Sequence, residues 1–173
     1  IVDVELVSRL EEKMKLIELA VALAYDAKVN MQDVYYQVRM WDTLIYNFLN
    51  KKGIVVPPGK RSDKDEKYAG AYVKEPTAGR YNWVVSFDLN SLYPHLIMQY
   101  NISPETLVEK RHPSATVNGL LSQSVEVPEE FCLCANGAMY RKDIHGFLPE
   151  MMKKIYDERV QSKKLMILAK QEY

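Results

Sequence analysis

The sequence lacks several features that would assign the protein to a functional class. Its 173 residues include 23 basic and 23 acidic side chains, so no net charge attracts nucleic acid or an anionic membrane over the whole surface. Any site for a polyanion must therefore be a local basic face. There is no apolar run of about 18 residues that could span a membrane, and the first residues lack the regions of a signal peptide.

Cysteine is also scarce, because the chain contains only Cys132 and Cys134. Two cysteines cannot build a disulfide framework, so we expect a reducing, cytoplasmic setting. A zinc site that combines this pair with His112 or His145 is disfavoured, since the spacing is C-x-C and there is no second pair. The chain begins without methionine at Ile1, and its last residues are helix-like, so we expect a fragment of a longer polypeptide or half of a split one.

Apolar periodicity predicts helices near the N-terminus. Residues 4–28 carry one apolar stripe at steps of three and four residues, with Asp3 where an N-cap would lie. A second, shorter helix fits residues 40–49. The Pro-Pro-Gly turn and mixed charges of residues 51–67 predict a solvated loop.

The second half of the chain mixes strand, turn and helix signals. Residues 81–89 are rich in β-branched and aromatic side chains and predict a strand. Asn118-Gly119 and Asn136-Gly137 are turn signals, and the second predicts a hairpin. A last helix is expected from Gly146, with Pro149 in its first turn. An α+β fold follows from these patterns.

A single carboxylate, Asp88, ends the predicted strand. Together with the backbone carbonyl of Leu89 it could hold Mg²⁺, which prefers a few carboxylate oxygens, substrate phosphates and water. A two-metal site would need a second carboxylate nearby. From spacing alone, a cap for the helix that starts near Ser91 is the simpler interpretation of Asp88.

Tyr93-Pro94 follows five residues after the carboxylate. The tyrosine ring could lie under a sugar and leave no room for a 2′-hydroxyl. The alternative is a tyrosine packed in the core with its hydroxyl hydrogen-bonded.

The stretch from Asp88 to Leu107 reads "DLNSLYPHLIMQYNISPETL" and resembles motif A of family B DNA polymerases, in particular the T-even phage branch. The flanking segments resemble the same family in the same order. These segments are "IVDVELVSRLEEKMKLIELAVALAYDAK" (the end of the exonuclease domain and the following helix), "MWDTLIYNFL" (the start of the palm), "YAGAYVKEP" (the element between exonuclease and palm) and "CANGAMYRKDIHGFLPEMMKKIYDERVQSKKLM" (the end of the first palm segment and the first fingers helix).

The resemblance implies roles for individual residues. Asp88 and the carbonyl of Leu89 would bind Mg²⁺ in a two-metal site of which this chain holds half, and Tyr93 would stack on the incoming sugar and exclude ribose. The remaining roles are triphosphate binding by Ser91 and Leu92 through their backbone, triphosphate binding by Arg159 and Lys163, and DNA contact by Tyr68 and Gly70.

Spacing adds an independent point about the two cations. Arg159 and Lys163 are four residues apart and so share one face of a helix, from which they could reach the phosphates of a nucleotide. The neighbouring cations Lys153, Lys154, Lys164 and Lys170 are interspersed with acidic residues, which is typical of a solvated helix face.

The family pattern implies a partial polymerase palm flanked by two helical segments. The expected segments are 1–35 (end of the exonuclease domain and connecting helix), 36–80 (start of the palm), 81–145 (first palm segment) and 146–173 (start of the fingers helix). Two departures matter: His95 and Leu96 replace the usual serine and isoleucine, and Asp3 lacks the companion tyrosine of an exonuclease site, which favours a helix cap.

The chain also stops before the second fingers helix and the D-T-D motif that would supply the second metal carboxylate. We therefore expect part of a DNA polymerase that is inactive on its own. The implied partners are primer–template DNA, a deoxynucleoside triphosphate (dNTP) and a second chain with the missing half, with no membrane and a location in the host cytoplasm if the source is a phage. The alternatives are a non-catalytic DNA-binding or assembly subunit or remnant, one half of a split polymerase and, less favoured, a stand-alone metal-dependent phosphotransferase. A dimer over the exposed palm surface is a further expected association.

Overall fold

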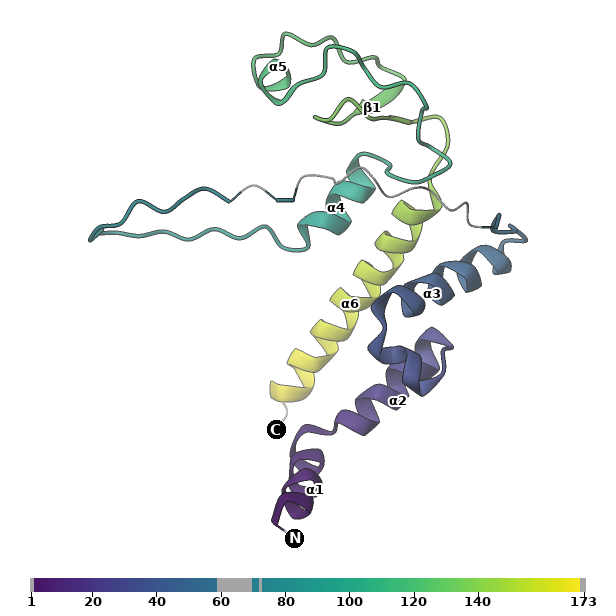
Figure 1. Cartoon of the computed structure of the whole chain (residues 1–173), viewed down its shortest axis with the longest axis vertical. Coiled ribbons are helices and arrows are strands. Elements are labelled where there is room, and N and C mark those ends of the chain that lie inside the picture. Colours follow the sequence, from purple (N-terminus) through teal and green to yellow (C-terminus); the bar gives the residue numbers. More distant parts are fainter. Residues whose placement is uncertain (1, 59–69, 72, 172–173) are drawn as a thin grey trace. The chain divides into compact units, whose positions relative to one another are not determined.

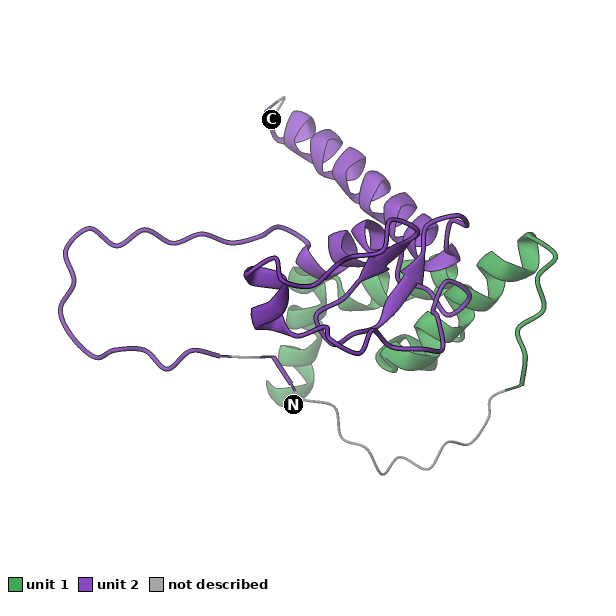
Figure 2. Ribbon diagram, turned by 90° about the horizontal axis from the view of Figure 1, so that it is seen from above, with its two compact units in different colours: residues 1–68 green, residues 69–173 purple. Residues whose placement is uncertain are grey.

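The structure is a computed structural model that describes residues 2–58, 70–71 and 73–171. The chain divides into two compact units, Ile1–Tyr68 and Ala69–Tyr173 (Figure 2). The described elements are helices and one small antiparallel sheet, which confirms the α+β class (Figure 1). None of the described helices combines the length and the apolarity needed to cross a membrane.

The first unit contains four helical elements: α1 (Val2–Met14), α2 (Leu16–Ala27), the 3₁₀ helix η1 (Met31–Tyr35) and α3 (Gln37–Lys51). Among the described residues of this unit, the buried apolar side chains are three alanines and one leucine: Ala20, Ala24, Ala27 and Leu49. The helix predicted at 40–49 is confirmed and extends further in both directions as α3. The predicted loop begins after α3, and its residues 59–67 lie outside the described part of the chain.

The prediction of one helix over 4–28 is wrong, because Lys15 adopts a left-handed conformation (φ 54°) and separates α1 from α2. The Glu11 carboxylate accepts the backbone N–H of Ile17 at 3.0 Å and so replaces a helical partner at the start of α2. Asp3 lies inside the first turn of α1 rather than before it, so the prediction of an N-cap there is also wrong. Its charge still suits the positive end of that helix.

The second unit contains α4 (Leu92–Gln99), α5 (Val117–Leu121), β1 (Phe131–Leu133), β2 (Met139–Arg141) and α6 (Phe147–Gln171). The predicted hairpin is confirmed, with Cys132 opposite Tyr140 in the antiparallel register. Gly137 supplies the positive φ of 82° that the turn needs. The helix predicted from Gly146 is confirmed as α6, with Pro149 in its first turn.

Two expectations for this unit are wrong. Asn118-Gly119 is not a turn but part of α5, whose N-cap Thr116 accepts the N–H of Gly119 at 3.0 Å. Residues 81–89 are not a strand: the described residues from 70 to 91 run as a long open loop in both views (Figures 1 and 2). A strand exists only with a partner, and no described backbone group pairs with residues 84–89.

Candidate functional site

The N-terminus of α4 presents backbone donors to solvent. Ser91 precedes the helix in a left-handed conformation (φ 55°) and makes no side-chain cap. Among the described residues, no group accepts the N–H of Leu92 or Tyr93, and Pro94 has none to offer. Free N–H groups at a helix N-terminus attract anions, as the sequence predicts for Ser91 and Leu92.

Asp88 and Leu89 lie just before this helix and are exposed to solvent. Within the described part of the chain, nothing donates a hydrogen bond to the Asp88 carboxylate, and the cap position belongs to Ser91. The capping interpretation of Asp88 is therefore not supported. An exposed carboxylate beside an exposed carbonyl offers the hard oxygen ligands that suit Mg²⁺, which needs only one or two protein carboxylates.

Tyr93 is 71% exposed, so the alternative of a core tyrosine is wrong. His95, one turn into α4, behaves differently. Its Nδ1 lies 2.9 Å from the carbonyl oxygen of Ser91, and its ring meets the edge of Tyr156 on α6 at 4.7 Å between centroids. The histidine thus packs α4 against α6.

The two helices also meet at a pair of predicted site residues. Arg159 Nη1 on α6 donates to Ser91 Oγ at 3.5 Å, across 68 positions of sequence. Figure 1 shows α4 beside the N-terminal half of α6. Lys163 lies one turn beyond Arg159, is exposed, and has no polar partner among the described residues. The structure therefore brings Ser91 and Arg159 together, while no hydrogen bond or ion pair joins Arg159 to Asp88.

The other cations of α6 are surface residues, as predicted. Lys153 pairs with Asp157 at 2.9 Å and Lys154 with Glu158 at 3.8 Å, both on exposed turns of the helix. Pairs of this kind contribute little to stability and leave the face solvated.

Of the two residues predicted to contact DNA, Tyr68 lies outside the described residues. Gly70 is described and exposed, and among the described residues other than its chain neighbours no heavy atom lies within 4 Å of the position that a Cβ would take. Its contact with DNA stays a prediction.

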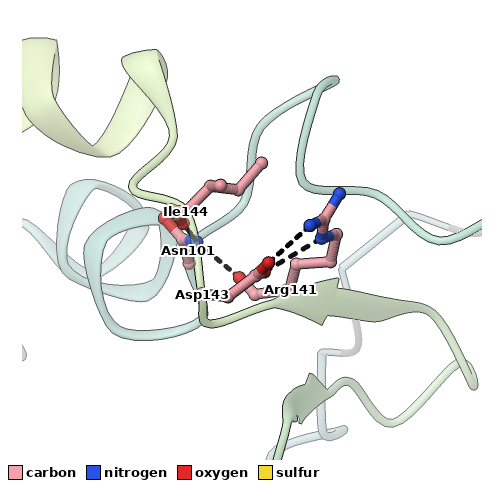
Figure 3. A network of polar contacts seen from close by, with 4 residues as sticks. All are labelled: Asn101, Arg141, Asp143 and Ile144. Carbon is pink, nitrogen blue, oxygen red and sulfur yellow. Dashed lines mark hydrogen bonds and ion pairs between the residues drawn. The ribbon is translucent and has the colours of Figure 1, made fainter.

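A buried polar network joins the loop after α4 to the start of α6, and sequence reasoning missed it. Asn101 Nδ2 donates to the carbonyl oxygens of Arg141 (2.6 Å) and Ile144 (2.7 Å) (Figure 3). Its Oδ1 accepts the N–H of Gly146 at 2.9 Å. At the edge of the network, the Arg141 guanidinium binds Asp143 and lowers the pKa of that carboxyl. The partners of Asn101 are 40 to 45 residues away, so no local sequence signal could have revealed them.

The cysteines do not form a metal site in the described residues, where no group of three or more histidine, cysteine or acidic side chains could hold an ion. Both are free thiols, and burial raises the pKa of Cys134, with a further contribution from Cys132. A protonated thiol is a poor metal ligand.

Comparison with known proteins gives consistent matches along the chain. The family model for DNA polymerase family B matches residues 30–173. The chain is 38% identical over 170 residues to a DNA-directed DNA polymerase of Escherichia phage RB69. The aligned region makes up 98% of this chain and 19% of that protein. The chain is 34% identical over 169 residues to the DNA-directed DNA polymerase of Enterobacteria phage T4 (96% and 18%) and 38% identical over 105 residues to a DNA polymerase of Pyrococcus glycovorans (61% and 12%). The chain thus spans about a fifth of the length of the phage relatives.

Proposed function

This chain belongs to DNA polymerase family B, in the branch of the T-even phage enzymes, and we propose that it forms the part of a template-directed DNA polymerase that holds the incoming dNTP. The reaction of the complete enzyme would be attack of a primer 3′ oxygen on the α-phosphate. Primer–template DNA would bind through phosphate contacts that weaken with salt, with Gly70 and Tyr68 at its edge. The cytoplasm of a host cell is the expected location.

The contact between Arg159 and Ser91 carries the proposal. It joins a planar guanidinium to a helix N-terminus whose first N–H groups have no acceptor among the described residues, and the exposed Lys163 follows one turn later. Backbone donors, an arginine fork and a lysine point charge together suit a triphosphate. The two cations would bind the outer phosphates, while Ser91 and Leu92 would bind through the backbone.

Asp88 and the carbonyl of Leu89 would hold Mg²⁺. The metal, when bound, would stabilise charge on the attacking and leaving oxygens. Tyr93 would lie under the sugar, where its exposed ring can reach a ligand. Asp88, Leu89 and Tyr93 lie in one short segment with the backbone donors of α4, so this segment would orient both the metal and the nucleotide.

A second candidate is a non-catalytic DNA-binding or assembly subunit, or one half of a split polymerase. Exposed apolar residues of the open loop, Trp83 (98%) and Phe87 (92%), offer a surface for a second chain or a dimer.

We expect the purified chain to show no primer extension with Mg²⁺ and dNTPs, because it supplies one metal carboxylate. A chimera in which it replaces the matching segment of the phage RB69 polymerase should extend a primer. The matching T4 segment, inserted at the same junctions, controls for the joins. Extension by the isolated chain would contradict the expected inactivity, and a folded chimera that neither extends nor binds dNTP would contradict the proposed function.

In that chimera, Tyr93→Ala should admit ribonucleotides, because the ring that excludes the 2′-hydroxyl is gone. Removal of one steric contact of this kind is worth about 1–3 kcal/mol, so the preference for dATP over ATP should fall roughly 5- to 150-fold. Single-nucleotide incorporation measures it, with Tyr81→Ala as a control at another exposed tyrosine. Unchanged sugar discrimination would refute the role given to Tyr93.

A further inference from the structure

The first turn of α6 begins with residues that are poor in capping groups. Gly146, which precedes the helix, has no side chain, and Pro149 has no N–H. Three backbone donors, those of Gly146, Phe147 and Leu148, therefore need acceptors from elsewhere.

All three donors are satisfied by one distant loop, residues 101–106, called the cap loop below. The bonds run from Gly146 N to Asn101 Oδ1 (2.9 Å), from Phe147 N to Glu105 Oε1 (2.6 Å) and from Leu148 N to Ser103 Oγ (3.4 Å). The carboxylate also meets the positive end of the helix dipole. A helix whose complete cap comes from 42 to 45 residues upstream is fixed at that end to another element.

The cap loop is held together by its own hydrogen bonds. Thr106 is fully buried, and its hydroxyl donates to the carbonyl of Asn101 at 2.6 Å and accepts the N–H of Ser103 at 3.1 Å. Ser103 Oγ donates to Glu105 Oε2 at 2.6 Å, which orients the carboxylate toward α6. Asn101 has a φ of 53°, a left-handed conformation that asparagine tolerates better than most residues.

The cap loop is continuous with α4. Tyr100 N–H donates to Leu96 O and Ile102 N–H donates to Ile97 O, so the loop begins as the helix ends. The two helices thus meet at three places: at the cap loop, at the ring contact of His95 with Tyr156, and at Ser91 with Arg159.

The distance along α6 makes the cap consequential. Arg159 lies twelve positions after Phe147, which is about 18 Å of helix. A tilt of about 10° at the cap would move Arg159 by about 3 Å, which exceeds the tolerance of a hydrogen bond. The direction of α6 at its first turn therefore determines where Arg159 and Lys163 lie.

We propose that the cap loop is a positioning element, in which Asn101, Ser103 and Glu105 fix the direction of α6 so that Arg159 and Lys163 face the N-terminus of α4. The functional part of this inference rests on the proposed role of those cations in triphosphate binding. The three capping side chains bond to the helix backbone and act on any ligand only through it.

The test uses the 173-residue chain and three variants. Glu105→Ala removes the exposed carboxylate of the cap, Glu105→Gln keeps an acceptor oxygen of the same shape, and Glu109→Ala is the matched control, a nearby exposed glutamate without a partner among the described residues. NMR gives hydrogen exchange at Phe147 and Leu148, the nuclear Overhauser contact between the His95 and Tyr156 rings, and the Kd of Mg²⁺–dATP.

In Glu105→Ala we expect exchange at Phe147 to rise on the order of tenfold. We also expect the ring contact to weaken and the Kd for Mg²⁺–dATP to increase several-fold. Glu105→Gln should bring the exchange rate at Phe147, the ring contact and the Kd for Mg²⁺–dATP most of the way back to the parent values. Glu109→Ala should match the parent chain. Asn101→Gly, which keeps the backbone conformation and removes the buried side chain, should act like a stronger Glu105→Ala if it folds.

Faster exchange with an unchanged ring contact would overturn the proposal, since the cap would then stabilise α6 without directing it. Unchanged exchange would overturn it as well. If exchange and ring contact respond as expected but the parent chain binds no dATP, the proposed nucleotide site fails and the positioning of α6 stands.

Discussion

Asp88→Ala is expected to reduce primer extension by the RB69 chimera on the order of 10³-fold. The substitution removes the carboxylate proposed to hold Mg²⁺, and metal stabilisation of transition-state charge is worth several kcal/mol. Asp88 is exposed and has no hydrogen-bond partner among the described residues, so its loss should leave the fold intact. Steady-state extension at saturating Mg²⁺ gives the rate, and circular dichroism gives the fold.

Glu75→Ala is the matched control for Asp88→Ala, because Glu75 is an exposed carboxylate of the same open loop. It should change the extension rate by less than about twofold, since surface substitutions of this kind are nearly neutral. Equal activity of the Asp88→Ala and parent chimeras would remove Asp88 from the metal site.

Gly146→Ala is expected to lower the free energy of unfolding of the second unit by about 1–3 kcal/mol, the range of an overpacked core position. A Cβ at Gly146 would lie 2.6 Å from the Cβ of Ser103 and 3.1 Å from Cδ of Pro149. Both contacts involve atoms held close to the backbone, so either the cap loop or the helix must shift. Hydrogen exchange of peptides that cover residues 139–151 localises the loss, and urea unfolding of the whole chain gives its size.

Two variants make the Gly146 prediction specific. Gly70→Ala places a Cβ where no heavy atom of the described residues beyond its chain neighbours lies within 4 Å, so it should change stability by less than about 0.5 kcal/mol. Ser103→Gly removes the clashing Cβ, so in the double variant Gly146→Ala should cost much less than it does alone. Strict additivity of the two substitutions would show that the close approach to Ser103 is not the cause.

Elements with local signals were predictable from the sequence. Gly137 with its asparagine neighbour marked the hairpin, and Gly146 with Pro149 marked the start of α6, because each residue acts on the backbone at its own position. The left-handed break at Lys15 had no such signal. Lysine seldom adopts this conformation. The hydrogen bond that accompanies the break joins the Glu11 carboxylate to the N–H of Ile17, six positions later in the chain.

Long-range pairing explains the larger errors. Residues 81–89 have strand composition, but composition cannot create the partner that a strand requires, and the described chain provides none. The segment therefore remains an exposed loop.

In the candidate site too, some features could be predicted from the sequence and others could not. The resemblance named Ser91 and Arg159, and the structure brings these two into contact, although their roles in nucleotide binding stay predictions. Spacing alone favoured a cap for Asp88 and offered a buried Tyr93 as the alternative, yet the first caps nothing and the second is exposed. The cap loop gave no signal at all, because its hydrogen bonds join positions that only folding brings together.

The distant origin of the α6 cap has a consequence for the order of folding. The later turns of α6 depend on neighbours three and four residues away and can form on the timescale of an isolated helix. Its first turn cannot be completed until a chain segment of 42 to 45 residues has closed on itself, an entropic cost paid before any of the cap bonds is gained. The helix should therefore form from its C-terminal turns toward Gly146. The cap loop should bind last, and its binding should fix α4 against α6 in one step.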